Sequence, residues 1–445
     1  MAIDFGLRQA APFVGLSERP ASALQDHRYF SIRDGHRKYP VDLQLKTFTA
    51  EYWNSWTVHH PSTIFEVRSN RRKKSELLAS NPIKTEMTIL TVAYPLLPAG
   101  PDSAGGAEQV LHLVERGIVA AGHRSLVIAA AGSIVSGELL KTASYLEEDT
   151  PRGFCHNSRP ESLFSSRKIT EDLQAQAQRA HRYHIEQALA DQKIDLIHLH
   201  GLDFHAYLPA TRIPMLATLH LPLAWYPSQI FHLPGVVLNC VSQAQAASAP
   251  DDLRLPVICN GIDVSHYYGN PSRQEFLLWL GRVCPEKGAH IALEIAHRLK
   301  RELILAGPVH PFPDHERYFT ECVQPLLDSK RRYVGAVGRQ TKIDLLAHAS
   351  CVLIPSQVPE TSTLVAMEAA ASGTPVVAAK LGALPEVIEH GVTGFLAGST
   401  EEIMEYVRRS SEISPQACRE RACQQFSDER MVKDYLALYQ RLLQN

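Results

Sequence analysis

The chain has 445 residues, of which 45% are hydrophobic and 21% charged, and its formal net charge is −2. This length predicts two to three domains of ~100–200 residues each. The near-neutral charge argues against a nucleic-acid-binding protein, which usually carries a strong basic excess. No apolar run reaches the ~18 residues that a membrane-spanning helix needs, so only peripheral contact with a membrane stays open.

Cysteine usage and the N-terminal segment both predict a cytoplasmic protein. The eight cysteines include no C-x-x-C pair, and Cys240 and Cys351 fall in apolar, strand-like runs. This pattern favours reduced, buried thiols over a disulfide framework or a zinc site. The first residues, MAIDFGLRQAAPFVG, lack the basic start and long apolar stretch of a secretory signal.

Residues 1–86 show no alternation of strand and helix patterns, and we expect them to form an N-terminal extension. They contain Trp53 and Trp56, and aromatic residues argue against full disorder. The basic run Arg71–Lys74 is typical of a solvated linker face, with an anion-binding patch as the minor alternative. The sequence predicts no role for this extension.

Residues 87–252 alternate between strand-like and helix-like runs, which predicts parallel βαβ units. One helical run spans 106–121 and places Val110, Leu111, Val114 and Ile118 on one face. The predicted strands are Thr88–Ala93, Leu126–Ala129, Ile194–Leu199, Met215–Leu219 and Val236–Val241. The segments Ser136–Lys168 and Ala224–Pro234 are predicted to be loops.

Residues 253–426 form a second alternating series after the break at Pro250–Pro256. Helices are predicted over 289–300, 342–349 and 362–372. Residues 427–445 predict a final helix with Ser427 as its N-cap. The predicted strands are Phe276–Leu280, Leu303–Ala306, Tyr333–Val337, Cys351–Ile354, Val376–Ala378 and Phe395–Ala397.

Two carboxylates flank the start of one predicted helix in this second series. Glu360 lies in the loop after the strand Cys351–Ile354, and Glu368 lies inside the helix that we expect to begin near Ser362. A ligand against that helix N-terminus, at Ser362-Thr363-Leu364, would contact free backbone N–H groups and both carboxylates. The alternative is a capping carboxylate and a solvent-facing one, but a charge on an otherwise apolar helix would be costly without partners.

The string GRVCPEKG follows the predicted strand Phe276–Leu280 and supplies two cations. Arg282 and Lys287 would lie at the carboxyl end of that strand, where a guanidinium and an ammonium suit a diphosphate. Taken alone, a surface turn with ordinary charges explains this string equally well. Beside the two glutamates it favours an anion site that needs no metal.

The first series offers weaker candidates at its own strand ends. Gly105 and Gly106 would let a phosphate or sugar approach the backbone, although SAGGAEQV is not the dinucleotide fingerprint. His220 follows the strand Met215–Leu219, where site residues concentrate, with a structural histidine as the alternative. We interpret His198 as strand core and His200 as cleft lining. The turn Asn260–Asp263 is expected to be a structural connection between the domains.

Together, GRVCPEKG, the two glutamates in the run that ends in ASGTPVVA, NGID and GALPEVIEHGVTGFL resemble the family 4 retaining nucleotide-sugar glycosyltransferases. The resemblance covers roughly Met87 to the end of the chain. It implies a GT-B fold, an α/β architecture of two Rossmann-like doubly wound domains that face a cleft, with the donor bound mainly by the second. It also implies that the final helix crosses back to the first domain.

The resemblance further implies roles for individual residues. Arg282 and Lys287 would hold the diphosphate, Glu368 the ribose and Glu360 the donor sugar, with Gly105, Gly106 and His220 near the sugar and its phosphate. A hexose from a UDP-linked donor would pass to a glycan, lipid or small-molecule acceptor with retention. The family often reads Glu-Pro-Phe-Gly where this chain has Glu360-Thr361-Ser362-Thr363.

No D-x-D string with supporting context is present, so no metal or other cofactor is expected. Three alternatives remain at the level of sequence. A GT-B epimerase or hydrolase would use the same donor pocket without an acceptor, and a phosphorylase would need a lysine-bound pyridoxal phosphate. A non-catalytic assembly partner would carry a vestigial pocket, against which Glu360, Arg282 and Lys287 argue.

Overall fold

The computed structural model describes residues 30–34, 37–41, 86–103, 105–143, 171–269, 273–310 and 312–444. The chain divides into two compact units, Met1–Leu78 and Ala79–Asn445, which are described separately. In the first, β1 (Phe30–Asp34) pairs antiparallel with β2 (Arg37–Val41). The predictions for Trp53, Trp56 and Arg71–Lys74 lie outside the described residues.

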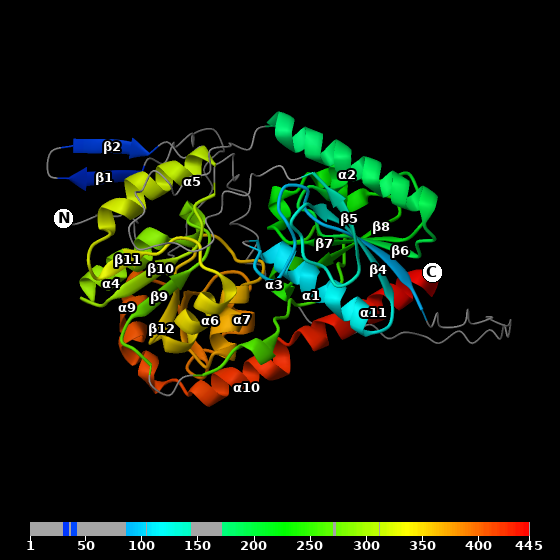
Figure 1. Cartoon of the computed structure of the whole chain (residues 1–445). Coiled ribbons are helices and arrows are strands. Elements are labelled where there is room, and N and C mark those ends of the chain that lie inside the picture. Colours follow the sequence, from blue (N-terminus) through cyan, green and yellow to red (C-terminus); the bar gives the residue numbers. More distant parts are fainter. Residues whose placement is uncertain are drawn as a thin grey trace, which may run out of the picture. The chain divides into compact units, whose positions relative to one another are not determined.

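The second unit contains two six-stranded sheets, and all the strand pairs in both are parallel. The first sheet has the order β5-β4-β3-β6-β7-β8 and the second β11-β10-β9-β12-β13-β14. Figure 1 shows the lobe built around each sheet. Both orders reverse direction beside the first strand of the sheet, which makes each lobe doubly wound. The predicted pair of Rossmann-like domains is confirmed, while the domain boundaries stay predictions.

The first lobe follows the predicted elements closely. Its strands are β3 (Thr88–Val92), β4 (Arg124–Ala130), β5 (Glu138–Thr142), β6 (Leu196–Leu199), β7 (Met215–Leu219) and β8 (Val236–Cys240). Its helices are α1 (Gly106–Ala120), α2 (Glu171–Asp191) and α3 (Gln243–Ala246), with short turns η3 (Phe204–Ala206), η4 (Leu223–Trp225) and η5 (Ser228–His232). The predicted apolar face of α1 is buried.

One strand of this lobe was not predicted. Residues 138–142, which we assigned to the loop Ser136–Lys168, form the edge strand β5. Only Thr142 of this strand is fully buried. An edge strand packs on fewer neighbours, so its sequence carries a weaker apolar pattern.

The second lobe carries β9 (Leu277–Leu280), β10 (Leu303–Ala306), β11 (Arg331–Tyr333), β12 (Cys351–Ile354), β13 (Val376–Ala379) and β14 (Gly394–Ala397). Its helices are α4 (Ala289–Arg298), α5 (Pro313–Tyr318), α6 (Arg339–His348), α7 (Leu364–Ala371), α8 (Leu384–Val387), α9 (Thr400–Arg409) and α10 (Pro415–Gln425). Shorter turns are η6 (Val264–His266), η7 (Pro285–Lys287), η8 (Phe319–Val323), η9 (Gln324–Leu326) and η10 (Ser410–Glu412).

The strand predicted at Tyr333–Val337 was placed too late, because β11 ends at Tyr333. The chain turns at Gly335, whose φ is 75°, a left-handed conformation that a strand cannot contain. Helix α7 begins at Leu364 rather than near Ser362. Thr363 is therefore its N-cap, although its side chain makes no capping hydrogen bond.

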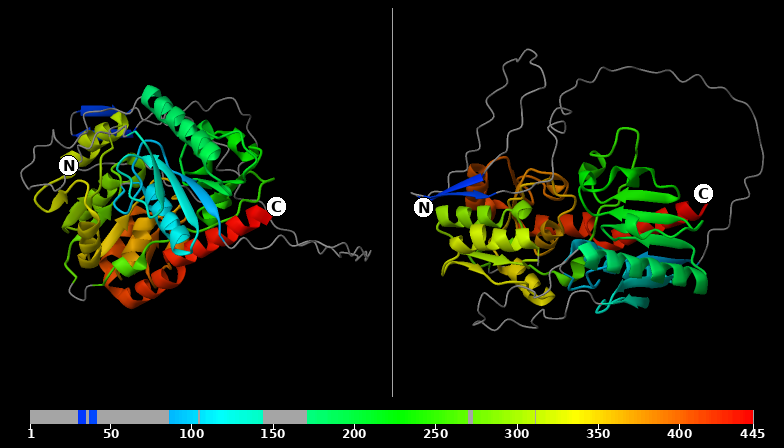
Figure 2. Two further views of the ribbon diagram at one scale, coloured as in Figure 1. Left: turned by 45° about the vertical axis from the view of Figure 1, so that its right-hand side comes forward. Right: turned by 90° about the horizontal axis from the view of Figure 1, so that it is seen from above.

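The final helix, α11 (Asp428–Gln444), returns to the first lobe as predicted (Figures 1 and 2). Its apolar face packs Met431, Tyr435, Leu438 and Tyr439 against a cluster that includes Met87 and Ile89 of the first lobe. The backbone N–H of Arg430 donates to Ser427 Oγ at 3.3 Å, as expected for an N-cap. Among the described residues, no helix is both long and apolar enough to cross a membrane.

A second connection joins the lobes at the predicted turn Asn260–Asp263. Arg116 of α1 bonds Asp263 at 2.8 Å and Asp428 at the start of α11 at 2.5 Å. The Asp428 backbone N–H donates to the Ile262 carbonyl at 3.0 Å. The structural role predicted for this turn is therefore consistent with its contacts.

Candidate functional site

The loop after β9 positions both predicted diphosphate cations. The chain passes from β9 through Gly281 and η7 into α4, and it turns at Gly288, whose φ is 66°. A Cβ at Gly288 would lie 2.2 Å from the Pro355 carbonyl oxygen, so only glycine fits there. The tight approach holds the loop that carries Arg282 and Lys287 against the loop that carries Glu360.

Lys287 and Glu360 form an ion pair between these two loops. Lys287 Nζ donates to both Glu360 carboxylate oxygens, at 2.7 and 2.6 Å, and Ser356 Oγ donates to one of them. Glu360 is 6% exposed, and a buried carboxylate without partners would cost several kcal/mol. The sequence assigned these side chains to different parts of a donor, whereas the structure joins them to each other.

Arg282 is the cation of this loop that is not engaged in an ion pair. Within the described parts of the chain its guanidinium makes no hydrogen bond or ion pair, and its side chain is half-buried. It lies close enough to Glu108 of the first lobe to affect the pKa of that carboxyl. Arg282 is thus available to an anionic ligand between the lobes.

Glu368 lies in the second turn of α7 and is held by two donors. Lys342 Nζ of α6 and the Tyr267 hydroxyl both donate to Glu368 Oε1, at 2.5 and 2.8 Å. Burial, followed by the Glu368 charge, raises the pKa of Tyr267. A small pocket of about 40 Å³ is lined by Glu368, Leu364, Tyr267, Arg339 and residues of α1. The predicted ribose carboxylate therefore faces a pocket between the lobes.

The start of α7 presents polar atoms without protein partners. Ser362 Oγ and Thr363 Oγ1 are buried, and neither has a hydrogen-bond partner among the described residues. They precede the free N–H groups of the first helical turn. Across from them, a Cβ on Gly106 would meet Leu364 Cδ1 at 3.4 Å, so the predicted glycine loop lies against the predicted anion site.

Glu108 is a candidate residue that the sequence analysis missed. It lies in the first turn of α1 and is 3% exposed, and its Oε2 lies 1.8 Å from where a Cβ of Gly105 would stand. Burial raises the pKa of Glu108 to about 7, although the nearby positive charge of Arg282 acts in the opposite direction. The absent side chain at Gly105 therefore makes room for this carboxyl. The position of this acidic residue, directly after Gly105 and Gly106, was the sequence feature that could have identified it.

His220 joins the two lobes through its backbone. Its carbonyl accepts from Thr361 Oγ1 of the second lobe at 3.0 Å, next to Glu360. Its backbone N–H donates to the Tyr226 hydroxyl at 3.1 Å. Tyr226 is 6% exposed, so it supports His220 from within the core of the first lobe.

The ring of His220 ends a chain of buried imidazoles. His220 Nε2 lies 3.2 Å from His200 Nδ1, and His200 Nε2 lies 3.1 Å from His198 Nδ1. His198 also contacts the Tyr439 hydroxyl of α11 at 2.6 Å and Thr218 Oγ1 at 2.8 Å. His198 is strand core as predicted, but His200 is 1% exposed and does not line an open cleft.

Counting the available donors and acceptors fixes the direction of the hydrogen bonds along these three histidines. The Asn239 amide donates to the Cys240 carbonyl, so its oxygen accepts from the Thr218 hydroxyl at 2.8 Å. The single Thr218 proton is then used, and His198 Nε2–H must donate to Thr218. In the same way, His200 Nε2–H donates to His198 Nδ1, and His220 Nε2–H donates to His200 Nδ1. All three rings therefore carry their proton on Nε2. Burial lowers the pKa of His220 to about 4, so the ring is neutral and keeps Nδ1 as an acceptor.

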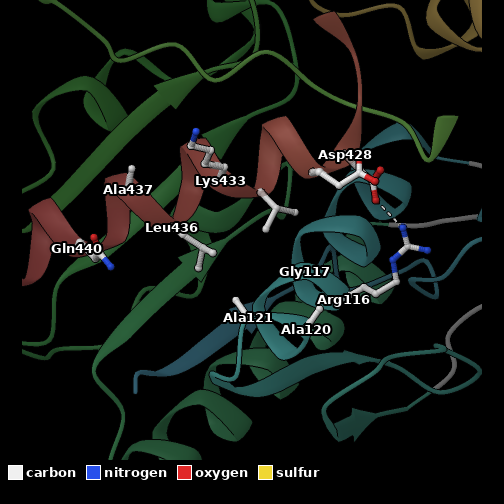
Figure 3. A pocket seen from close by; sticks show the side chains of 11 residues that line it. Arg116, Gly117, Ala120, Ala121, Asp428, Lys433, Leu436, Ala437 and Gln440 are labelled. Atoms are coloured by element: carbon white, nitrogen blue, oxygen red, sulfur yellow. Dashed lines mark hydrogen bonds and ion pairs between the residues drawn. The ribbon is translucent and has the colours of Figure 1, made fainter. Parts of the chain in front are cut away.

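A pocket of about 630 Å³ lies elsewhere, between α1 and α11 (Figure 3). Arg116, Gly117, Ala120, Val432 and Leu436 are among its lining residues. None of the predicted site residues lines it. The volume of this groove reflects its openness along two helices, whereas the polar groups converge at the smaller pocket beside Glu368.

Two family models match the chain, one on each lobe. Residues 104–266 match the Glycosyltransferase Family 4 model, and residues 274–412 match the Glycosyl transferases group 1 model. The matched ranges contain all the predicted site residues: Gly105, Gly106, His220, Arg282, Lys287, Glu360, Ser362, Thr363, Leu364 and Glu368.

Curated relatives match over part of their length. D-inositol 3-phosphate glycosyltransferase of Corynebacterium efficiens is 30% identical over 168 residues, covering 33% of this chain and 39% of the relative. Its counterpart in Mycolicibacterium smegmatis is 30% identical over 213 residues, covering 43% and 49%. Glycogen synthase of Mycobacterium tuberculosis is 32% identical over 154 residues, covering 33% and 36%. The chain thus spans less than half the length of these relatives.

Solved structures share the fold over most of the chain. AviGT4, a glycosyltransferase involved in avilamycin A biosynthesis, is 24% identical with a TM-score of 0.59, covering 80% of this chain and 98% of that one. Sucrose-phosphate synthase from Thermosynechococcus elongatus is 18% identical with a TM-score of 0.62, covering 80% and 99%. HepE of Anabaena, solved with UDP and glucose, is 21% identical with a TM-score of 0.58, covering 79% and 99%.

At these identities the structural likeness concerns the fold, which is the predicted GT-B architecture of two Rossmann-like lobes. The family models and the names of the relatives agree with it. The chain therefore belongs to the family 4 glycosyltransferases with the GT-B fold.

Proposed function

We propose that this glycosyltransferase moves a hexose-type sugar from a nucleoside diphosphate donor, uridine-linked, to a hydroxyl acceptor. In this proposal the configuration at the anomeric carbon is retained, and no metal is required. The observation that carries it is the convergence of predicted donor residues from both lobes. Gly106 lies against Leu364, and the His220 carbonyl is bonded to Thr361 beside Glu360. HepE, solved with UDP-glucose, supports a uridine-linked donor.

Departure of the diphosphate is the slow event in this proposal. Negative charge grows on the leaving oxygen as the glycosidic bond breaks, and fixed positive groups aimed at that oxygen lower the barrier. Arg282 is suited to this task, since no carboxylate in the described residues forms an ion pair with it. Lys287, oriented by Glu360, supplies a second positive group from the same loop. The acceptor oxygen attacks from the leaving-group face, and the diphosphate takes its proton.

In this proposal the ribose of the donor lies beside the small pocket at α7. Lys342 and Tyr267 both bond Glu368 Oε1, and no described residue bonds Oε2. That oxygen is therefore the acceptor that we assign to a ribose diol. The buried hydroxyls of Ser362 and Thr363 would bond the phosphate or the sugar.

The proposal is tested first with Arg282→Ala in a coupled assay of UDP release, after a thermal-shift screen of nucleotide sugars. Turnover should fall by about 10²–10³, the typical loss when one charge-stabilising donor is removed. Arg332→Ala removes an exposed arginine of β11 and should leave turnover unchanged.

Two results would overturn the proposal. One is full activity of the Arg282 variant. The other is release of an epimer or free sugar at the full rate from donor alone, which would indicate an isomerase or hydrolase. Comparing the anomeric configuration of the product with that of the donor tests retention, and adding a chelator to the UDP-release assay tests metal independence.

A further inference from the structure

We propose that Cys284, Glu286 and His315 form a binding site for Zn²⁺ beside the loop that carries Arg282 and Lys287. The sequence argued against a zinc site because it contains no C-x-x-C pair. The fold instead brings together two residues of GRVCPEKG and one from the separate helix α5.

The three side chains are close enough to share one ion. Their ligand atoms, Cys284 Sγ, a Glu286 oxygen and a His315 nitrogen, all lie within 4.8 Å of one another. Tetrahedral Zn²⁺ with bonds of ~2.0–2.3 Å needs its ligand atoms ~3.3–3.8 Å apart. Side-chain rotation alone can supply the remaining approach, because each residue contributes a rotatable bond.

Two of these ligand groups have buried atoms without protein partners. Glu286 Oε2 and His315 Nδ1 are both shielded from solvent, and neither has a hydrogen-bond partner among the described residues. Cys284 is 1% exposed; its thiol donates weakly to the Arg282 carbonyl oxygen at 3.6 Å and also lies within hydrogen-bonding reach of the Glu286 carboxyl. Buried polar atoms are normally bonded, so two unpartnered ones in neighbouring side chains indicate a missing partner.

The ligand chemistry selects the metal. A thiolate, an imidazole and a carboxylate form a set that suits Zn²⁺, whereas Mg²⁺ prefers oxygen ligands alone. Binding exchanges the Cys284 thiol proton for the cation and releases the proton to solvent. The thiolate and Glu286 together balance the two charges of the ion, and water would fill the fourth position.

A bound Zn²⁺ would connect α5 to the loop that carries Arg282 and Lys287. Cys284 is the N-cap of η7, which contains both Glu286 and Lys287, while His315 comes from α5 (Pro313–Tyr318). A bound ion would therefore restrict the motion of the segment that places Arg282 and Lys287. This consequence rests on the proposed function, but the metal site itself does not.

The test is titration of the metal-free full chain with Co²⁺, which substitutes for Zn²⁺ and reports thiolate ligation by a sulfur-to-cobalt charge-transfer band. The wild-type protein should show this band with one ion bound, and Zn²⁺ should displace it. Cys284→Ser should abolish the band, and His315→Ala should weaken Co²⁺ binding at least tenfold.

Matched variants keep the result unambiguous. Cys423→Ser removes an exposed thiol, and Cys155→Ser removes one outside the described residues; both should keep the band. His232→Gln is the control for the imidazole. No band in the wild type, or a band that survives Cys284→Ser, would overturn the site. Circular dichroism must show Cys284→Ser folded, and His315→Ala decides the question if it is not.

A second readout reports the tie between α5 and the loop. Zn²⁺ should slow amide hydrogen exchange in residues 282–288 and 313–318 of the wild type, but not of Cys284→Ser. Absence of that protection would refute the tie. Because neither measurement uses a sugar donor, failure here would leave the proposed transfer untouched, and failure of transfer would leave the metal site standing.

Discussion

Glu368 shows how one buried side chain can serve two partners at once. Its Oε1 accepts hydrogen bonds from Lys342 and Tyr267, and these bonds offset the desolvation cost of a carboxylate in an apolar helix. The same bonds fix Oε2 toward the small pocket. Lys342 and Glu368 therefore act as a preorganised pair, in which the lysine sets the position of the group that we assign to the ribose.

We expect Glu368→Ala to weaken UDP binding more than it lowers turnover at saturating donor, because a ribose contact is present before and during the reaction. Isothermal titration calorimetry measures the affinity. Lys342→Ala breaks the same ion pair but keeps the carboxylate, so it should cost stability of the order of 3–5 kcal/mol while affecting UDP affinity less. Equal UDP affinity in wild type and Glu368→Ala would remove the ribose assignment.

Sequence reasoning found the charges of the site but not their pairing. Glu360, Lys287, Arg282 and Glu368 were recognisable because charged residues interrupt apolar or glycine-rich strings at strand ends. The bond between Lys287 and Glu360 was not, since it depends on how two loops approach at Gly288. Lys342 and Tyr267 were missed for the same reason: their partners lie far away in the chain.

At the scale of elements, the histidine chain links the end of β7 to helix α11. His220, His200 and His198 come from two adjacent strand ends, and Tyr439 and Tyr435 come from α11. The direction of the hydrogen bonds along the histidines depends on Thr218, because its hydroxyl oxygen accepts from His198 Nε2–H and so fixes the His198 tautomer. Tyr439 adds a bond without setting that direction.

This difference gives a matched pair of variants. Thr218→Val removes the acceptor for His198 Nε2–H, frees the tautomers and should lower turnover about tenfold, the effect of ~1.4 kcal/mol. Tyr439→Phe should cost stability of ~1–3 kcal/mol with little effect on turnover. Turnover and urea denaturation distinguish the two, and equal losses of turnover in both variants would refute the assigned direction.

The packing of α1 on α11 gives a second prediction for elements. A Cβ on Gly117 would lie 2.3 Å from Val432 Cγ2, and a β-branched valine has few rotamers with which to withdraw. Gly117→Ala should therefore destabilise the unit by ~1–3 kcal/mol. Gly338→Ala is the control, since its Cβ would meet nothing within 4 Å. Unchanged denaturation midpoints in both variants would mean that the two helices adjust without cost.

Most strands were predictable because buried parallel strands are continuous apolar runs. The exceptions have local causes. Strand β5 is a half-exposed edge, and β11 is cut short by the left-handed turn at Gly335. Helix α7 starts late because Thr363 does not adopt the helical conformation, which the residue types alone do not reveal.

At the scale of the molecule, buried histidines make stability depend on pH. Burial lowers the pKa of several histidines to about 4 (His181, His220, His290 and His310), and lowers the pKa of His198 and His200 well below its usual range. An unfolded histidine has a pKa of about 6.5, so between about 6.5 and 4 the unfolded chain binds more protons than the folded one.

The free energy of unfolding should therefore fall as the pH is lowered from about 6.5 toward 4. Glu108 and Glu294, whose pKa burial raises to about 7, and Asp428, whose pKa it raises to about 6, act in the opposite sense. The histidines outnumber these three carboxyl groups, so we expect a net decrease in the free energy of unfolding. Urea denaturation at several pH values measures it, and a constant or rising free energy of unfolding upon acidification would contradict the expectation.

The return of α11 has a consequence for synthesis. Its residues Met431, Tyr435 and Tyr439 fill the core around Met87 and Ile89, and Tyr439 bonds His198. While the chain is still growing on the ribosome, the first lobe has all its strands long before it has this helix. It must wait, with an apolar face uncovered, until the second lobe has been translated. The two lobes are thus fastened together by a segment that is translated after both of their sheets.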